Sequence, residues 1–224
     1  MQLTKDDILS HSFVISIDEK RLELFYSRMK EIDFNGIKHV IGRLDSKYGA
    51  ENLNKTVKDI LLYSKRNKFP YITIFEDDAF PIKNFNLDFQ ECINNLPDDA
   101  TCILLGYNSA NSIYNKDPKL KYDNFQNCKD IFINQKDIKK CWGSQAYIIF
   151  ESDYDRLLKY LDFFNPYDEH SMTDTDSYLR KKNKNFYVKK IPLFIQKNID
   201  NINNIHKGEG NECAKKLNEI YHLY

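Results

Sequence analysis

The stretch YITIFEDD, residues 71–78, constrains the fold more than any other part of this sequence. The run YITIF is almost continuously apolar and rich in aromatic and β-branched side chains, which is typical of a strand buried on both faces. Such strands form the centre of parallel sheets that helices cover on both sides. Three consecutive acids, Glu76, Asp77 and Asp78, end the run. Their mutual repulsion requires a cation, a set of hydrogen-bond donors or solvent to offset it.

Segments with strand and helix periodicity alternate on either side of this strand. We predict strands at 12–18, 37–43, 71–78, 100–106 and 145–150, and helices at 19–32, 52–69, 85–96, 152–164 and 173–182. The stretch 185–196 is expected to close the regular structure. A Ser cap is expected to open the helix at 152–164. The polar stretch 107–135 has no clear period, so short strands and a functional loop both stay open. The alternation predicts an α/β fold with a mixed, mostly parallel sheet and helices on both faces.

The three acids would lie where α/β sheets bind ligands, outside the carboxyl ends of the strands. Carboxylates there suit a hard divalent cation, Mg²⁺ or Mn²⁺, and a nucleotide-diphosphate leaving group needs such a cation. The alternative is a solvated turn whose acids cap the next backbone segment. For a metal site we prefer Asp78 first and Glu76 second as ligands, because Asp77 is expected to point to the opposite side if the strand geometry continues through it.

Composition narrows the class of partner. The chain has 224 residues, enough for one domain with a substantial core, and its 33 basic and 33 acidic residues cancel. This balance gives no support to a nucleic-acid partner. The five cysteines form no C-x-x-C pair, which favours reduced thiols and a cytoplasmic location. We find no signal peptide and no stretch of membrane-spanning length, so any membrane contact is expected to be peripheral.

Several stretches, in their order along the chain, resemble glycosyltransferase family 25, the lipopolysaccharide and collagen galactosyltransferase type. The similar stretches are FVISIDEKRLELFYSRM, YITIFEDDA, WGSQAYIIFESDYDRLL and TDTDSYL. The resemblance spans roughly residues 12–200 and implies a Rossmann-like GT-A fold. It also implies one glycosyltransferase domain over 1–224, with a nucleotide-sugar half at about 12–106 and an acceptor half at about 107–224.

The resemblance implies roles for individual residues at the donor site. Glu76 and Asp78 would hold the metal and the nucleotide sugar, with Asp77 assisting. The other implied donor contacts are Ile17, Arg21, Thr56, Gly143 and Ser144. His206 could complete the metal sphere, although a lone exposed histidine without a ligand role is the alternative. For Arg28, on the same helix as Arg21, a solvated helix face is the favoured interpretation.

The stretch TDTDSYL offers a second acid. An inverting transfer needs a general base that takes the proton from the acceptor hydroxyl, and the resemblance implies Asp174 or Asp176 for this role, with Asp176 preferred. The alternative is a capping box, in which Thr173 and Asp176 only stabilise the start of a helix.

These observations lead to one preferred function and one alternative. The preferred function is a metal-dependent inverting, galactosyltransferase-like enzyme that moves a hexose from a UDP-sugar to a hydroxyl of a glycan or glycoconjugate, as in lipopolysaccharide or glycan biosynthesis. The alternative is a catalytically inactive GT-A-like domain that binds a glycan or a protein partner. The family tends to carry Gly-Cys and Ser-His where this chain has Asn52-Leu53 and Thr56-Val57, and this departure supports the alternative.

Overall fold

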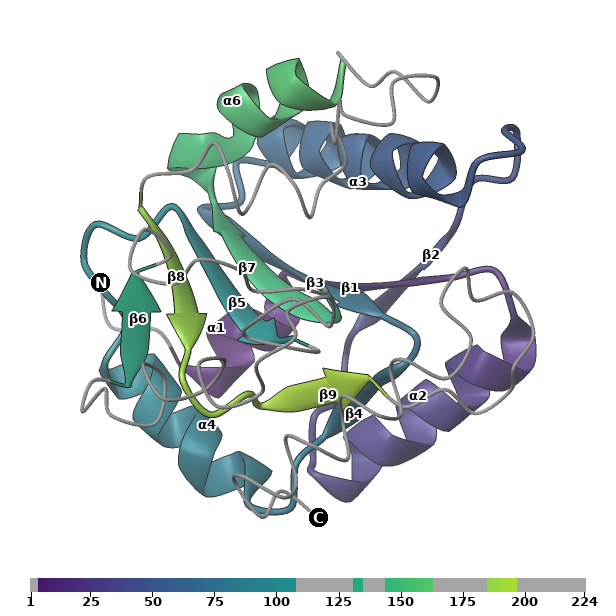
Figure 1. Ribbon diagram of the computed structural model, residues 1–224. Coiled ribbons are helices and arrows are strands. Elements are labelled where there is room, and N and C mark those ends of the chain that lie inside the picture. Colours follow the sequence, from purple (N-terminus) through teal and green to yellow (C-terminus); the bar gives the residue numbers. More distant parts are fainter. Residues whose placement is uncertain (1–3, 108–130, 135–143, 163–184, 197–224) are drawn as a thin grey trace, which may run out of the picture.

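In the described part of the chain, nine strands form one sheet, with helices on both of its faces (Figure 1). The computed structural model describes residues 4–107, 131–134, 144–162 and 185–196. The strands are β1 (Ser12–Ser16), β2 (Lys38–Ile41), β3 (Tyr71–Glu76), β4 (Ala79–Pro81), β5 (Cys102–Gly106), β6 (Phe132–Asn134), β7 (Ala146–Phe150), β8 (Phe186–Lys189) and β9 (Phe194–Gln196). The helices are α1 (Lys5–Ser10), α2 (Glu19–Glu31), α3 (Gly49–Arg66), α4 (Phe85–Asn94) and α6 (Glu151–Leu161).

The sheet is mixed and mostly parallel, as the sequence predicted. Its order is β2-β1-β3-β7-β5-β8-β6, and β9 joins β5 to β4 at one end. Strands β1, β2, β3, β5, β8 and β9 run in one direction, whereas β4, β6 and β7 run in the other. The predicted α/β class is therefore confirmed.

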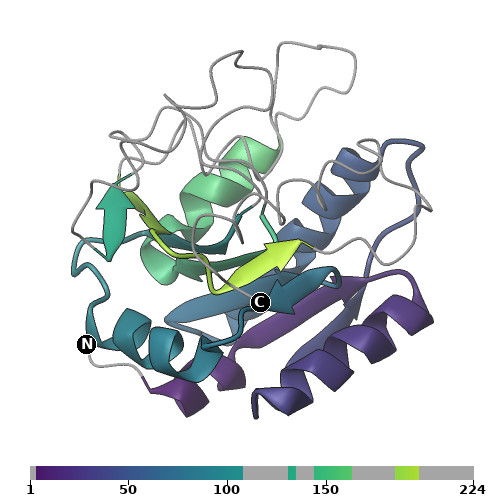
Figure 2. The ribbon, with the colours of Figure 1, turned by 60° about the horizontal axis from the view of Figure 1, so that its bottom comes forward.

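The first three strands explain why helices cover both faces. Strand β1 lies between β2 and β3, so the chain moves one way across the sheet through α2 and back the other way through α3. Right-handed crossovers in opposite directions place their helices on opposite faces. Figures 1 and 2 show α3 and α6 together on one face and α1, α2 and α4 on the other. This reversal makes the carboxyl ends of β1 and β3 the point at which α/β folds bind ligands.

Aromatic side chains fix the elements around the central strand. Phe75 on β3 is fully buried, and its ring centroid lies 5.8 Å from Phe25 of α2 and 5.2 Å from Phe194 of β9. Phe34, just after α2, lies 6.1 Å from the same ring. These contacts hold a helix and a distant strand against the residue next to the acidic stretch.

Helix α3 buries the face that its periodicity predicts. Its buried residues include Val57, Ile60, Leu61 and Ser64, all on the predicted inner face, together with two polar residues, Asn54 and Thr56. Among the helices in the described ranges, none is both long and apolar enough to cross a membrane.

Of three local expectations, one is refined by the structure, one is wrong and one stays a prediction. The regular structure predicted to close the chain at 185–196 is two strands, β8 and β9, separated by a segment that contains Pro192, which has no N–H for a sheet hydrogen bond. Helix α6 begins at Glu151 with Phe150 as its N-cap residue, so the predicted Ser152 cap is wrong. The predicted helix 173–182 lies outside the described residues.

Helix α1 and strand β4 were not predicted, and β6 lies in the stretch 107–135, where short strands were left open. Helix α1 has six residues, and β4 and β6 have three residues each. None of them is long enough to show a clear period. A capping box between Thr4 and Asp7 marks the start of α1.

The aromatic cluster makes a prediction about stability. Replacing Phe75 by Ala removes the ring that α2 and β9 share, so we expect the free energy of unfolding to fall by about 3–5 kcal/mol. Leu87→Ala, at a position that is 77% exposed, is the matched control and should change stability little. Urea unfolding followed by circular dichroism measures both variants. Equal losses in the two variants would contradict the packing described for Phe75.

Candidate functional site

Polar side chains from three parallel strands and one turn meet at the carboxyl edge of the sheet. Ser16 ends β1, Glu76 ends the neighbouring β3, and Gln196 ends β9. Asp77 and Asp78 form the turn that leads from β3 into β4. The acids therefore lie at the edge where the sequence predicted a ligand site.

Asp77 is held from β1 and from α2. The Ser16 hydroxyl donates a hydrogen bond of 2.6 Å to Oδ2 of Asp77. Nη2 of Arg21 forms an ion pair with Oδ1 of the same carboxylate. Both oxygens of Asp77 thus have partners from elements that precede β3 in the chain.

Within the described ranges, Asp78 has partners on only one of its two oxygens. Nε2 of Gln196 donates a hydrogen bond of 2.6 Å to Oδ2, and Nη2 of Arg21 lies 3.5 Å from that oxygen. Oδ1 of Asp78 is buried and makes no hydrogen bond to any described residue. One nitrogen of Arg21 therefore bridges the two carboxylates, and one carboxylate oxygen is left over.

The two carboxylates lie beneath the arginine. Their side chains are each 8% exposed, whereas that of Arg21 is 35% exposed. Burial raises the pKa of Asp77 and of Asp78 above the ordinary value, because the ionised form loses hydration. The Ser16 hydroxyl lowers the pKa of Asp77, the Gln196 amide lowers that of Asp78, and Arg21 lowers both, but burial remains the largest effect.

The expectation that Asp77 points away from Asp78 is wrong. Both carboxylates contact the same guanidinium group. The strand ends at Glu76, so the alternation of side chains does not continue through the next two residues, which form a turn.

Arg28 is a second arginine beside the acid pair. It is 7% exposed, which corrects the expectation of a solvated helix face. Its guanidinium carbon lies 5.1 Å from the centre of the Phe80 ring, and Nη1 lies 3.5 Å from the carbonyl oxygen of Ala79. Burial lowers the pKa of Arg28, and the negative charges of Asp78 and Asp77 oppose that shift. Arg28 lies two helical turns beyond Arg21 on α2, so both arginines are on the helix face that is directed toward Asp77 and Asp78.

Glu76 makes a separate contact on the other side of β3. The Ser144 hydroxyl donates a hydrogen bond of 2.7 Å to Oε1 of Glu76, and the Glu76 amide donates one of 2.9 Å to the carbonyl of Gln145. These bonds extend the antiparallel pairing of β3 with β7. Two sequence-predicted site residues, Glu76 and Ser144, are thereby in direct contact.

The other sequence-predicted site residues fall into two groups. Ile17, directly after β1, is 54% exposed at the same edge, and Thr56 is buried in α3. Thr56 accepts a hydrogen bond from the Arg43 amide and donates one to the Asn52 carbonyl, so its hydroxyl joins the segment after β2 to α3. The residues that lie outside the described ranges are Gly143, Asp174, Asp176 and His206.

The acid pair fits a divalent cation of the magnesium type. In the described residues, no group of three or more His, Cys, Asp or Glu side chains could hold a metal ion. Mg²⁺ commonly binds one or two carboxylates and takes its remaining ligands from water and substrate phosphates, so a cage of protein ligands is not required. The unpartnered Oδ1 of Asp78 is an oxygen of the required kind.

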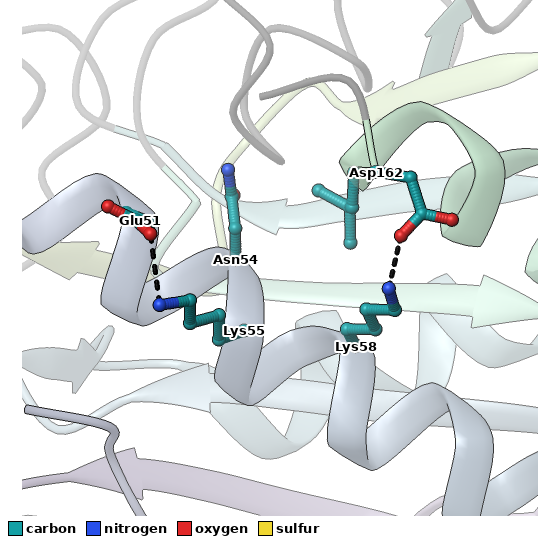
Figure 3. Close-up of a pocket in the computed structure, with 6 residues that line it drawn as sticks. Glu51, Asn54, Lys55, Lys58 and Asp162 are labelled. Atoms are coloured by element: carbon teal, nitrogen blue, oxygen red, sulfur yellow. Dashed lines mark hydrogen bonds and ion pairs between the residues drawn. The ribbon is translucent and has the colours of Figure 1, made fainter. Parts of the chain in front are cut away.

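A polar pocket of about 220 Å³ lies between α3 and the end of α6 (Figure 3). Its charges pair with one another: Lys55 lies 2.9 Å from Glu51, and Lys58 forms an ion pair with Asp162. Lys55 is also 3.1 Å from Asp45. Among the described residues that line it, the pocket therefore offers no unbalanced positive charge to an anion such as a diphosphate, and none of them is a sequence-predicted site residue.

Sequence reasoning missed Ser16, Gln196 and the burial of Arg28. Ser16 and Gln196 share a signal with the acids, because each is a polar residue that ends an apolar strand. Arg28 carries no comparable signal, since a charged residue on an amphipathic helix is usually exposed.

Comparisons with known proteins support the fold. No family profile and no curated protein sequence matches the chain. A solved glycosyltransferase involved in the glycosylation of the major capsid of PBCV-1 has a TM-score of 0.50 and 6% identity, over 91% of this chain and 97% of that chain. A protein from STIV has a TM-score of 0.41 and 15% identity, over 87% and 97% of the two chains. The first likeness shows a Rossmann-like glycosyltransferase fold, and the second is too weak to carry an argument.

The raised pKa of Asp78 predicts how stability depends on pH. Above the ordinary value of 3.8, the unfolded chain has released a proton that folded Asp78 still holds, so the free energy of unfolding falls as pH rises toward the folded pKa. Asp78→Asn cannot titrate, and we expect a shallower fall for this variant than for the wild type. Urea unfolding at pH values from about 4 to 7 measures the slope.

The matched control for this experiment is Asp59→Asn. Asp59 is another aspartate paired with an arginine, Arg43, but on the exposed surface of α3. Its variant should keep the wild-type slope. If Asp78→Asn also keeps it, the buried carboxylate does not titrate as described.

Proposed function

We propose that this chain is a metal-dependent inverting glycosyltransferase that uses a nucleotide-diphosphate sugar, most simply a UDP-hexose. The observation that carries the proposal is the buried Asp77–Asp78 pair, with its unpartnered oxygen, at the ligand-binding edge of a glycosyltransferase-like fold. The acceptor would be a hydroxyl of a glycan or glycoconjugate. The resemblance to family 25 favours a galactosyl donor and a role in lipopolysaccharide or glycan biosynthesis.

The acid pair would hold the cation and, through it, the diphosphate. Asp78 would supply Oδ1 as the first ligand, with Asp77 beside it, and Mn²⁺ or Mg²⁺ would neutralise the charge that develops on the leaving diphosphate. Glu76 lies on the side of β3 that faces β7, and its hydrogen bond with Ser144 would fix the segment that enters β7 beside the donor site. Residues 12–106 would form the nucleotide-sugar half and residues 107–224 the acceptor half of one domain.

Inversion requires one base and one displacement. The acceptor oxygen would attack the anomeric carbon from the face opposite the diphosphate as Asp176 or Asp174 takes its proton. The bond to the diphosphate breaks in the same step, and a nucleoside diphosphate leaves. Ile17, Arg21 and Gly143 are the further donor contacts in this proposal, and His206 is a further metal ligand.

A specific observation supports the inactive alternative. Arg21 already contacts both carboxylates, and Thr56 is committed to hydrogen bonds with the Arg43 amide and the Asn52 carbonyl. A domain that only binds a glycan or a protein partner could keep this arrangement permanently. The two functions differ in whether the protein binds a nucleotide sugar.

Donor binding separates the two functions. Thermal unfolding is measured with UDP-, GDP- and CMP-sugars, each with and without Mn²⁺. We expect a UDP-sugar with Mn²⁺ to stabilise the fold, by about 2.7 kcal/mol at a concentration about 100-fold above Kd. Asp78→Asn should lose the Mn²⁺-dependent part of the shift, while Asp59→Asn keeps it. If no nucleotide sugar shifts the transition in either condition, the transferase proposal fails.

The base is tested separately from the donor. We expect either Asp176→Asn or Asp174→Asn to lower kcat by about 10²–10⁴-fold while leaving donor binding intact, because only proton transfer from the acceptor is lost. Asp155→Asn, at an exposed acid of α6 that pairs with Lys65, is the control and should keep full activity. Full activity in both single variants would place the base elsewhere.

A further inference from the structure

One guanidinium nitrogen of Arg21 bridges the two carboxylates of the acid pair. Nη2 contacts Oδ1 of Asp77 and lies 3.5 Å from Oδ2 of Asp78. A divalent cation that bound both carboxylates would compete with Arg21 for their oxygens. We infer that Arg21 competes with the cation for Asp77 and Asp78, and that cation binding releases the Arg21 side chain toward the donor diphosphate. The exchange rests on the proposed function, since the cation is the one that the transfer would use.

The pair needs one counter-charge at all times. Two adjacent buried carboxylates are strongly destabilised when a cationic partner is removed without replacement. Gln196 and Ser16 donate hydrogen bonds but carry no charge, and Arg28 is directed to Phe80 and the Ala79 carbonyl. A direct replacement of the guanidinium by a metal ion therefore keeps the pair compensated throughout.

Side-chain exposure indicates that Arg21 is the partner of Asp77 and Asp78 that can be displaced. Arg21 is 35% exposed and lies on the solvent side of the two carboxylates, which are 8% exposed. The other partners are more firmly placed: Ser16 is 3% exposed and Arg28 is 7% exposed. The unpartnered Oδ1 of Asp78 provides a further ligand atom that Arg21 does not occupy.

The backbone of Arg21 need not move in the exchange. Its amide donates a hydrogen bond of 3.0 Å to the N-cap residue Asp18, which fixes the first turn of α2. Only the side chain has to rotate, and it remains attached near the N-terminus of a helix, where backbone dipoles also favour anions. A guanidinium freed there is suited to bind two phosphate groups at once.

The exchange predicts opposite effects of one substitution on two ligands. In Arg21→Gln, the competitor is gone, so we expect Mn²⁺ to bind about tenfold more tightly than to the wild type, as measured by electron paramagnetic resonance of free Mn²⁺ without nucleotide. UDP should bind about tenfold more weakly to the Mn²⁺-loaded variant in calorimetry, since the variant has no guanidinium group that could be released toward the diphosphate. A merely structural role for Arg21 would weaken both ligands together.

Two further variants complete the test. Arg43→Gln removes an arginine from an exposed pair with Asp59 and should leave both affinities unchanged. Arg21→Lys keeps a positive charge but loses the planar fork, so its affinity for Mn²⁺ should lie between those of the wild type and Arg21→Gln. It also provides a reading if Arg21→Gln does not fold, which circular dichroism will show.

The outcomes distinguish the exchange from the proposed function. Unchanged or weaker Mn²⁺ binding in both Arg21 variants overturns the exchange, while the transferase proposal stands if a UDP-sugar still binds. Absence of Mn²⁺ and Mg²⁺ binding to the wild type and the variants overturns the exchange and the metal assignment together. If a UDP-sugar then binds without metal, the proposal of glycosyl transfer stands without the metal, and an activity assay tests it.

Discussion

The ion bridge from Arg21 to Asp77 and Asp78 is the interaction on which this end of the molecule depends. Two neighbouring acids at the end of a buried strand repel each other, and burial makes the repulsion worse. The chain compensates them with an arginine from α2, a hydroxyl from β1 and an amide from β9. Helix position, turn geometry and strand order are thereby coupled, because a shift in any of them leaves a buried charge without its partner.

The parts of the fold that the sequence predicted are those in which local pattern records burial. The apolar run before Glu76 showed a central strand, and the spacing of Val57, Ile60 and Leu61 showed the inner face of α3. The acids were correctly placed at the sheet edge because polar residues that follow a buried strand leave the sheet there. Strands of three residues leave no such pattern, so β4 was missed, and β6 falls in a stretch where short strands were only one of two alternatives.

The partners of the acids could not be predicted for a different reason. The Ser16–Asp77 hydrogen bond spans 61 positions and the Gln196–Asp78 bond spans 118, so no local window contains both members. Arg28 was misread because a charged residue on a helix is usually solvated, and only the packing of α2 on β4 shows that Phe80 covers it. The ligand of the site depends on the side chains that would contact it, and the fold alone does not specify them.

The position of β9 in the chain has a consequence for synthesis. In the described part of the structure, β4 pairs only with β9, and Gln196 lies 118 residues after Asp78. At translation rates of about 5–20 residues per second, a nascent chain would expose β4 as an open edge for about 6–24 seconds after the turn is made. Unpaired edges attract other strands. A chain that stops before β9 therefore lacks the Gln196 hydrogen bond to Asp78 and exposes β4 as an unpaired edge strand. We expect such a chain to be a substrate for chaperones.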